Sequence, residues 1–274
     1  MWALLQSTQK NLILIMSNKL NVRLFQADLK WQAANENIQK LVDMADELSG
    51  VDLLICPEMF TSGFTMAVQN VAQVWPGESV NALQQLADKS DTAIICSLGI
   101  RDREKYYNRL VFFKPNANPD YYDKRHLFTM GEEHHYYSAG TKQLVLEYKN
   151  WNIMPLICYD LRFPVWSRNT HDYDLLIYVA NWPDSRRDVW QTLLKARALE
   201  NQCFVAGVNR VCKDGMGLNY AGDSVLIDAK GHNVASCVDY HETSCDVQID
   251  KSELAAFREK FPVLKDGDSF TILP

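Results

Sequence analysis

The sequence lacks the cysteine pairs that mark zinc ribbons and thioredoxin-type redox sites. Its seven cysteines are scattered, and none stands in a Cys-x-x-Cys arrangement. Disulfides persist in secreted proteins, whereas thiols stay reduced in the cytosol. An odd number of dispersed cysteines therefore indicates a reducing compartment, and we expect a cytoplasmic protein.

The chain also has fewer basic residues than acidic ones. The chain carries 28 lysine and arginine residues against 34 aspartate and glutamate residues, which gives a net charge of −6. This balance argues against a nucleic-acid partner and against binding to an anionic membrane surface.

Long apolar runs are absent as well. No stretch approaches the roughly 20 consecutive apolar residues of a membrane-spanning helix, so no membrane partner is expected. The apolar start of the chain is interrupted by polar residues that include Lys10 and Asn11, and it has no basic beginning. It does not fit a signal peptide. We therefore expect residues 1–15 to be an appendage outside the fold, and residues 16–274 to form a single domain.

Several motifs of common enzyme classes are missing too. The chain contains no G-x-S-x-G nucleophile elbow, no G-x-G-x-x-G fingerprint and no G-x-x-x-x-G-K-[ST] phosphate loop. His134 and His135 resemble a metal-ligand pair only superficially, because adjacent residues point apart and no H-E-x-x-H frame surrounds them. We therefore expect neither a metal nor a cofactor.

The composition, with 47% hydrophobic and 23% charged residues, is that of a globular protein with a sizeable core. Short apolar runs predict strands at residues 20–26, 51–56, 92–100, 108–114, 175–180 and 204–208. Helical spacing of apolar residues predicts helices at residues 35–48, 79–89, 186–201 and 252–260.

Three further elements are predicted near polar residues of interest. A strand is expected over residues 121–128, where it carries Lys124, and a hairpin is expected to pair residues 143–148 with 151–158. A helix is expected to begin near Pro164. Because strands alternate with helices and some neighbouring strands form hairpins, the predicted fold class is α/β, with a mixed sheet or two stacked sheets and helices outside.

Three chemically useful side chains fall where a predicted buried strand gives way to a loop, namely Glu58, Cys158 and Asn181. That edge is where open α/β folds bind ligands. Cys158 precedes the expected helix, whose first N–H groups would lower the thiol pKa and offer donors to an oxyanion. Taken alone, such a cysteine is more often an inert, buried residue than a nucleophile.

Amide cleavage through a thioester requires a thiol, a carboxylate and a cation. The thiol of Cys158 would attack the amide, and Glu58 would act as the base that moves its proton. Lys124 and the backbone N–H of Tyr159 would stabilise the tetrahedral oxyanion. Taken separately, Glu58 and Lys124 would be ordinary surface charges, so the prediction depends on the combination.

Five motifs together resemble the nitrilase superfamily of carbon–nitrogen hydrolases. They are Pro57–Phe60, Tyr122–Phe128, Cys158–Pro164, Ala180–Pro183 and Ala196–Asn201. The motifs occur in the family's order and cover nearly the whole chain, which makes the set specific although each motif alone would be weak.

The resemblance implies a fold and a set of catalytic residues. The family fold is a four-layer α-β-β-α sandwich. The family's catalytic glutamate, lysine and cysteine fall on Glu58, Lys124 and Cys158. Its second glutamate falls on Glu133 rather than Glu132, judged by the spacing to the glycine that follows, and the sequence alone leaves Glu132 as the alternative.

The resemblance also implies a homodimer, since family members commonly pair through their outer helices. The helices expected after Cys158 and at residues 186–201 carry Trp166, Trp190 and Leu194 among charged residues. We expect the pairing surface there.

Within the superfamily, residues 60–64 and 159–168 resemble the bacterial ω-amidase branch. Members of that branch hydrolyse the side-chain amide of 2-oxo acids such as 2-oxoglutaramate, so a small-molecule amide substrate is implied. A deaminated-glutathione amidase or another aliphatic amidase of the same superfamily is the alternative. A non-catalytic scaffold with the same fold is a different class, and the intact Glu58, Lys124 and Cys158 count against it.

Four residues beside these motifs are candidates for binding the substrate. Phe64, Tyr159 and Trp182 each adjoin a motif residue, and we expect them to line the pocket. Arg162 has two alternatives: it pairs with Asp160 or another acid inside the fold, or it holds a substrate carboxylate, which suits its planar guanidinium. Asp160 is expected to cap the following helix.

Overall fold

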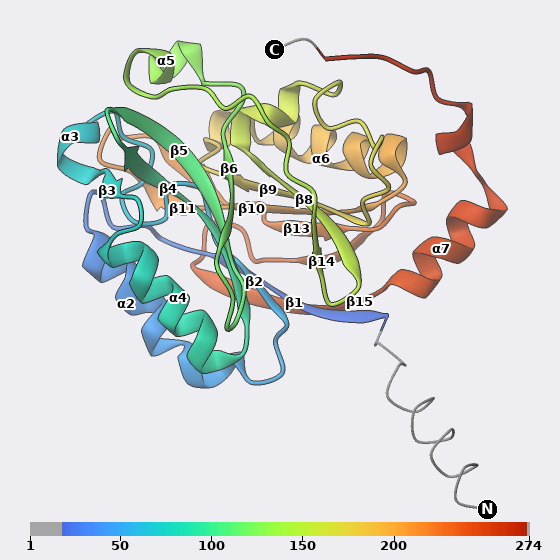
Figure 1. Ribbon diagram of the computed structural model, residues 1–274, viewed down its shortest axis with the longest axis horizontal. Helices are drawn as coiled ribbons and strands as arrows, with labels where there is room; N and C mark the ends of the chain where they lie inside the picture. The colour runs from blue at the N-terminus through green and yellow to red at the C-terminus, as the bar shows by residue number, and fades with distance from the viewer. Residues whose placement is uncertain (1–17, 273–274) are drawn as a thin grey trace, which may run out of the picture.

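Two β-sheets pack face to face at the centre of the protein, whose computed structural model describes residues 18–272 (Figure 1). The strands of the first sheet are, in spatial order, β15 (Thr243–Asp250), β1 (Lys19–Gln26), β2 (Leu53–Ile55), β4 (Ala93–Asp102), β5 (Lys105–Phe113) and β6 (Asp120–Asp123), with β3 (Gln73–Val74) beside β4. Those of the second sheet are β14 (Asn233–Ser236), β13 (Val225–Ile227), β10 (Phe204–Asn209), β9 (Leu175–Ala180), β8 (Trp151–Ile157) and β7 (Leu146–Tyr148). A separate ribbon consists of β11 (Val211–Lys213) and β12 (Asn219–Ala221).

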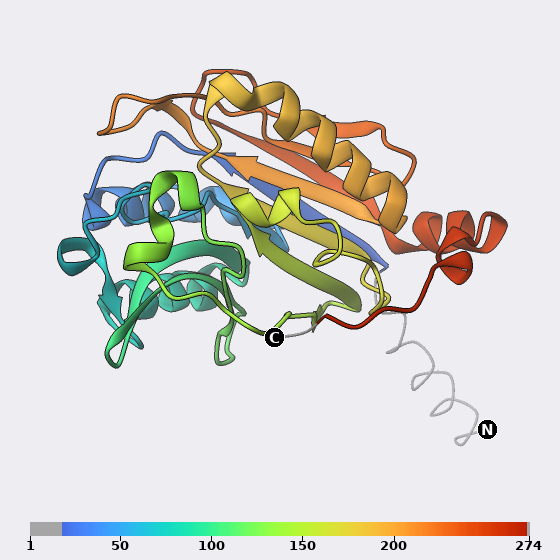
Figure 2. The ribbon, with the colours of Figure 1, turned by 90° about the horizontal axis from the view of Figure 1, so that it is seen from above.

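Helices cover the outer face of each sheet (Figure 2). The first sheet is covered by α2 (Ala34–Asp43) and α4 (Glu78–Ser90), and the second by α6 (Arg187–Asn201). The other α-helices are the short α3 (Val68–Val71) and α5 (Glu133–Tyr136), and α7 (Lys251–Lys260) near the end of the described chain. The layers therefore follow the order helix, sheet, sheet, helix. The predicted α/β class and the four-layer α-β-β-α sandwich are confirmed.

Apolar side chains from both sheets form the central core. Leu24 and Ile55 of the first sheet belong to the same buried cluster as Ile153 and Leu176 of the second, and all four are 0% exposed. A second cluster lies outside the first sheet, where α2 and α4 pack on it. Each sheet is thus buried on both faces, which explains why its strands appear in the sequence as continuous apolar runs.

The strand directions bring the candidate residues to one edge. β2 is parallel to β1 and β4, and β9 is parallel to β8 and β10. β6 runs in the direction of β4, because each of them is antiparallel to β5. Glu58, Lys124, Cys158 and Asn181 therefore all follow the carboxyl end of a strand.

One expected element at this edge is shorter than predicted. The strand expected over residues 121–128 ends at Asp123, so Lys124 follows the strand instead of lying within it. The backbone N–H of Arg125 bonds to the hydroxyl of Tyr122, and the N–H of His126 bonds to the carboxylate of Asp160. Side chains thus replace the sheet as partners of this segment.

The prediction of a helix beginning near Pro164 is wrong. The chain instead forms a 3₁₀ helix over Cys158–Arg162 (η3), and the N–H of Phe163 bonds to the carbonyl of Asp160. The helix expected over residues 35–48 is also divided, into α2 and a 3₁₀ turn at Ala45–Leu48.

The appendage predicted at residues 1–15 lies outside the described residues. Within residues 18–272, no helix combines the length and the apolar character that crossing a membrane requires.

A close contact between α6 and β10 gives a test of the packing. A Cβ added to Gly207 would lie 2.9 Å from Cζ2 of Trp190 and closer still to Leu194. We therefore expect Gly207→Ala to lower the free energy of unfolding by about 1–3 kcal/mol through overpacking. Urea unfolding would measure the change. Gly99→Ala in β4 is the control, since its nearest contacts are 3.4 Å; equal losses in the two variants would contradict the interpretation.

Candidate active site

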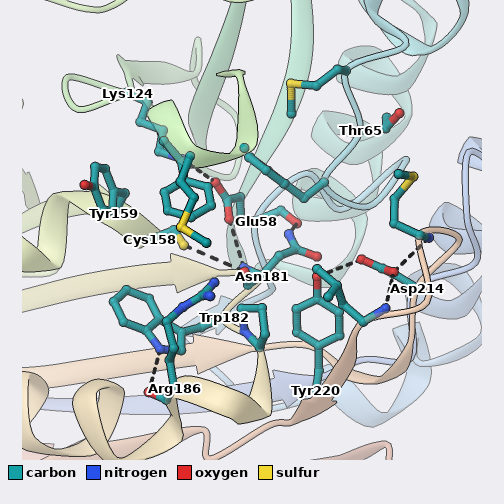
Figure 3. Close-up of a pocket in the computed structure, with 18 of the residues that line it drawn as sticks. Glu58, Thr65, Lys124, Cys158, Tyr159, Asn181, Trp182, Arg186, Asp214 and Tyr220 are labelled. Atoms are coloured by element: carbon teal, nitrogen blue, oxygen red, sulfur yellow. Dashed lines mark hydrogen bonds and ion pairs between the residues drawn. The ribbon is translucent and has the colours of Figure 1, made fainter. Parts of the chain in front are cut away.

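A pocket of about 350 Å³ opens at the carboxyl ends of the strands (Figure 3). Glu58, Lys124 and Cys158 line it together, although they come from three separate segments of the chain. Apolar and aromatic side chains form much of the remaining wall, among them Phe64, Phe128, Tyr159, Trp182 and Tyr220.

The ammonium group of Lys124 is enclosed by two carboxylates. Nζ lies 2.9 Å from Oε1 of Glu58, 2.9 Å from Oε2 of Glu133 and 3.1 Å from Oε1 of Glu133. Both glutamates are 0% exposed and the lysine is 1% exposed, so water screens these charges little. The three donors of the ammonium are all directed at carboxylate oxygens.

Two asparagines fix the glutamates in place. Nδ2 of Asn108 donates to Oε1 of Glu58 at 2.8 Å and to Oε1 of Glu133 at 3.0 Å. The N–H of Asn181 donates to Oε2 of Glu58 at 2.8 Å, and its side-chain amide donates to the Glu58 carbonyl at 2.6 Å. Because Glu58 follows a strand of the first sheet and Asn181 a strand of the second, these bonds join the two sheets at the pocket.

The structure places Glu133 in the cluster and leaves Glu132 exposed. Besides its contacts with Lys124, Glu133 accepts a bond of 2.6 Å from the N–H of Phe128. Asn108, in contrast, was not identified from the sequence. Its signal is a carboxamide directly before the apolar end of strand β5, where a buried polar group requires a partner.

Backbone strain accompanies the site. Cys158, Met59 and Glu132 have φ angles of 43°, 47° and 58°, in the left-handed region that residues other than glycine seldom adopt. Each is a candidate residue or the direct neighbour of one. Such conformations cost on the order of 1–3 kcal/mol each and persist where surrounding contacts fix them. At Cys158 the sharp turn presents a half-buried thiol to the pocket.

Asp160 holds this turn from behind. Its buried carboxylate accepts bonds from the N–H of Ile157 at 3.1 Å, from the N–H of His126 at 3.0 Å and from the hydroxyl of Tyr122 at 2.8 Å. The bond from Ile157 is the local, cap-like contact that the sequence predicted. The prediction that Arg162 pairs with Asp160 is wrong, because the Arg162 guanidinium lies over the Trp182 ring, 5.1 Å from its centroid.

The charges of the cluster shift its pKa values. Burial raises the pKa of the Cys158 thiol well above its ordinary value; Glu58 adds to this effect and Lys124 opposes it. Burial also raises the pKa of Glu133, against the opposing charge of Lys124. Burial alone would lower the pKa of Lys124, but the charges of Glu133 and Glu58 outweigh it, so the pKa rises. The prediction that a helix start lowers the thiol pKa is therefore wrong.

The four substrate-binding candidates all line the pocket. Phe64, Tyr159, Trp182 and Arg162 belong to its wall, and Arg162 is exposed there. Sequence reasoning missed Arg186, Asp214 and Trp31, which also line the pocket. These residues lie in loops or short turns away from the family motifs, so their position depends on tertiary structure.

The two adjacent histidines lie outside this pocket wall. His134 and His135 were expected to point apart, but their ring centroids are only 3.9 Å from each other on the short helix α5. Among the residues from 18 to 272, no group of three or more histidine, cysteine, aspartate or glutamate side chains is placed to hold a metal ion.

Several known proteins are similar to this chain in sequence and in fold. A family model described as carbon-nitrogen hydrolase matches residues 21–259. Omega-amidase YafV of Escherichia coli K12 is 42% identical over 255 residues, which cover 92% of this chain and 98% of that protein. A 2-oxoglutaramate amidase of Bacillus subtilis is 34% identical, covering 90% and 97%. The crystal structure of XC1258 from Xanthomonas campestris, a CN-hydrolase superfamily protein with an arsenic adduct in its active site, has a TM-score of 0.90 at 41% identity, covering 93% of this chain and 99% of that one.

The charge balance around Cys158 can be tested by alkylation. Lys124→Met removes the cation that opposes Glu58 at the thiol, so the thiol pKa rises further. We expect iodoacetamide to label Cys158 more slowly at pH 7, by about tenfold for each added pKa unit, with partial recovery at higher pH. Mass spectrometry of the Cys158 peptide against pH would measure the rate.

The exposed Cys212 provides an internal reference in the same digest. Thermal unfolding followed by circular dichroism would verify that Lys124→Met is folded. Labelling of Cys158 at the wild-type rate at pH 7 would show that Lys124 does not set the charge of the thiol.

Proposed function

The chain belongs to the carbon-nitrogen hydrolase family, and on that premise we propose that it is an ω-amidase, which hydrolyses the side-chain amide of 2-oxo dicarboxylic acid monoamides such as 2-oxoglutaramate. The observation that carries the proposal is the meeting of Glu58, Lys124 and Cys158 in one pocket. The names of the Escherichia coli and Bacillus subtilis relatives support the choice of substrate.

Acylation begins with a proton transfer. Glu58 takes the proton of the Cys158 thiol, and the sulfur attacks the carbon of the substrate amide. The resulting oxyanion is stabilised by Lys124 and by the backbone N–H of Tyr159, the residue after the nucleophile. The protonated Glu58 then gives its proton to the departing nitrogen, so that ammonia leaves and a thioester remains on Cys158.

Hydrolysis of the thioester reverses the roles. Glu58 accepts a proton from water as the water oxygen attacks the thioester carbon, and the second oxyanion uses the same donors. The C–S bond breaks, Glu58 returns its proton to the sulfur, and the product acid releases its own proton to solvent and leaves as a carboxylate. Glu133 and Asn108 act as positioning residues, because they hold Lys124 and Glu58 through the bonds described above.

A homodimer formed by the outer face of α6 is part of this proposal. The residues expected at that surface belong to the protein's own core instead, since Trp166 is 5% exposed and Trp190 and Leu194 are 0% exposed. The apolar residue that α6 does expose is Leu199, at 46%. We also propose that residues 16–274 form a single domain. We further propose a cytoplasmic location, and the finding that all seven cysteines are free supports it.

Cys158→Ala should lower turnover by at least about 10³-fold, because the nucleophile is lost while the backbone of the turn is retained. The measurement compares product release from 2-oxoglutaramate, glutamine and deaminated glutathione, before and after the substitution. The proposal expects 2-oxoglutaramate to be the preferred substrate of the unaltered protein. Preference for deaminated glutathione would replace the ω-amidase assignment, and turnover retained by folded Cys158→Ala would refute the mechanism.

Light scattering at micromolar concentration should give about twice the chain mass of 31.4 kDa. Leu199→Glu should reduce the mass toward that of one chain, because it places a charge in the pairing surface. Val42→Glu is the matched control: Val42 is 45% exposed and belongs to α2 on the opposite outer layer. A stable monomer of the unaltered protein would refute the dimer.

A further inference from the structure

Arg186 is a cation of the pocket that the proposed chemistry does not use. It ends a short 3₁₀ helix, Asp184–Arg186 (η4), and its half-buried side chain lines the pocket. The guanidinium carbon lies 5.6 Å from the centroid of the Phe128 ring. The Arg186 carbonyl accepts a bond of 2.9 Å from Nε1 of Trp182. Trp182 thus holds the backbone of Arg186, and Phe128 lies against its guanidinium group.

The two acidic residues of the pocket wall already have partners. Glu58 pairs with Lys124 at 2.9 Å. Asp214 accepts two bonds from backbone N–H groups through Oδ1 and a bond of 2.8 Å from the hydroxyl of Tyr220 through Oδ2. These carboxylates are therefore not available to neutralise the remaining cations of the wall.

Arg162 and Arg186 are those remaining cations, and both contact Trp182. Arg162 lies over the ring of Trp182, and the N–H of the same ring holds the Arg186 carbonyl. Within the described part of the chain, neither guanidinium pairs with a carboxylate. An arginine that lies against an aromatic ring keeps its N–H donors available, and their planar arrangement matches a carboxylate.

We propose that Arg186, together with Arg162, holds the carboxylate of the amide substrate. The inference rests on the proposed function and deepens it, because it assigns recognition of the substrate's remote carboxylate to Arg186, a residue outside the catalytic cluster. Figure 3 shows Lys124 and Glu58 on one side of Cys158, and Arg186 with Trp182 on the other. The amide of the substrate lies at Cys158, and its carboxylate lies at the arginines.

Matched substrates test this assignment. 2-Oxoglutaramate carries the remote carboxylate, whereas pentanamide has the same number of carbons and no charge. Arg186→Met should raise the KM for 2-oxoglutaramate by about 10–100-fold, the effect of one charge-assisted hydrogen bond, with a much smaller change in kcat. The kcat/KM for pentanamide should stay within about twofold, since pentanamide has nothing for Arg186 to bind.

Two further variants control for charge and geometry. Arg186→Lys keeps the charge but loses the planar fork, so we expect a smaller rise in KM. Lys89→Met removes an exposed positive charge from α4, on the opposite outer layer and outside the pocket, and should leave both substrates unaffected. Equal losses on both substrates, or an unchanged KM for 2-oxoglutaramate in Arg186→Met, would overturn the inference.

A binding measurement separates this inference from the proposed function. Calorimetric titration of glutarate into the Cys158→Ala protein measures carboxylate binding without turnover, and adding Arg186→Met should weaken it by about tenfold or more. If the unaltered protein fails to hydrolyse 2-oxoglutaramate, the proposed function fails and the glutarate titration still decides the role of Arg186. Glutarate affinity that does not depend on Arg186, in variants with the wild-type thermal midpoint, would refute that role.

Discussion

The buried ammonium of Lys124, held between Glu58 and Glu133, is the interaction on which the rest of the site depends. Removing three charged groups from water is costly, and their mutual attraction compensates only when geometry and hydrogen bonding are good. Here Asn108 donates to both carboxylates, and Asn181 ties Glu58 to the opposite sheet. Loss of Lys124 would leave two buried carboxyl groups without their cation. The bonds from Asn181 also make the cluster constrain both sheets at their carboxyl edges.

The same cluster determines how the thiol of Cys158 behaves. Its pKa is raised by burial and by Glu58, so the resting thiol is neutral at pH 7. A neutral thiol is a weak nucleophile, which means that attack depends on transfer of the proton to Glu58 during the reaction. The carboxylate that raises the thiol pKa is therefore also the base that accepts its proton. This coupling restricts formation of the thiolate to the catalytic step.

The sequence predicted those features of the site that depend on local pattern and on the ordered family motifs. Strand ends placed Glu58 and Cys158 at one edge, because parallel strands present their carboxyl ends together. The helix near Pro164 was predicted wrongly, since a carboxylate at position 160 and several 3₁₀ bonds turn the chain there. Asn108 and Arg186 were missed because the residues they contact, Glu58 and Phe128, are distant from them in sequence.

The charge distribution also explains which end of a substrate reaches the thiol. The buried cluster around Lys124 contains the carboxyl groups of Glu58 and Glu133, both within hydrogen-bond distance of the ammonium. A substrate carboxylate placed against that cluster would be repelled, and like-charge contact at low dielectric is costly. A neutral amide meets no such penalty there, while Arg162 and Arg186 attract the charged end. The carboxyl groups that serve catalysis thereby favour the productive orientation of an anionic amide over the reversed one.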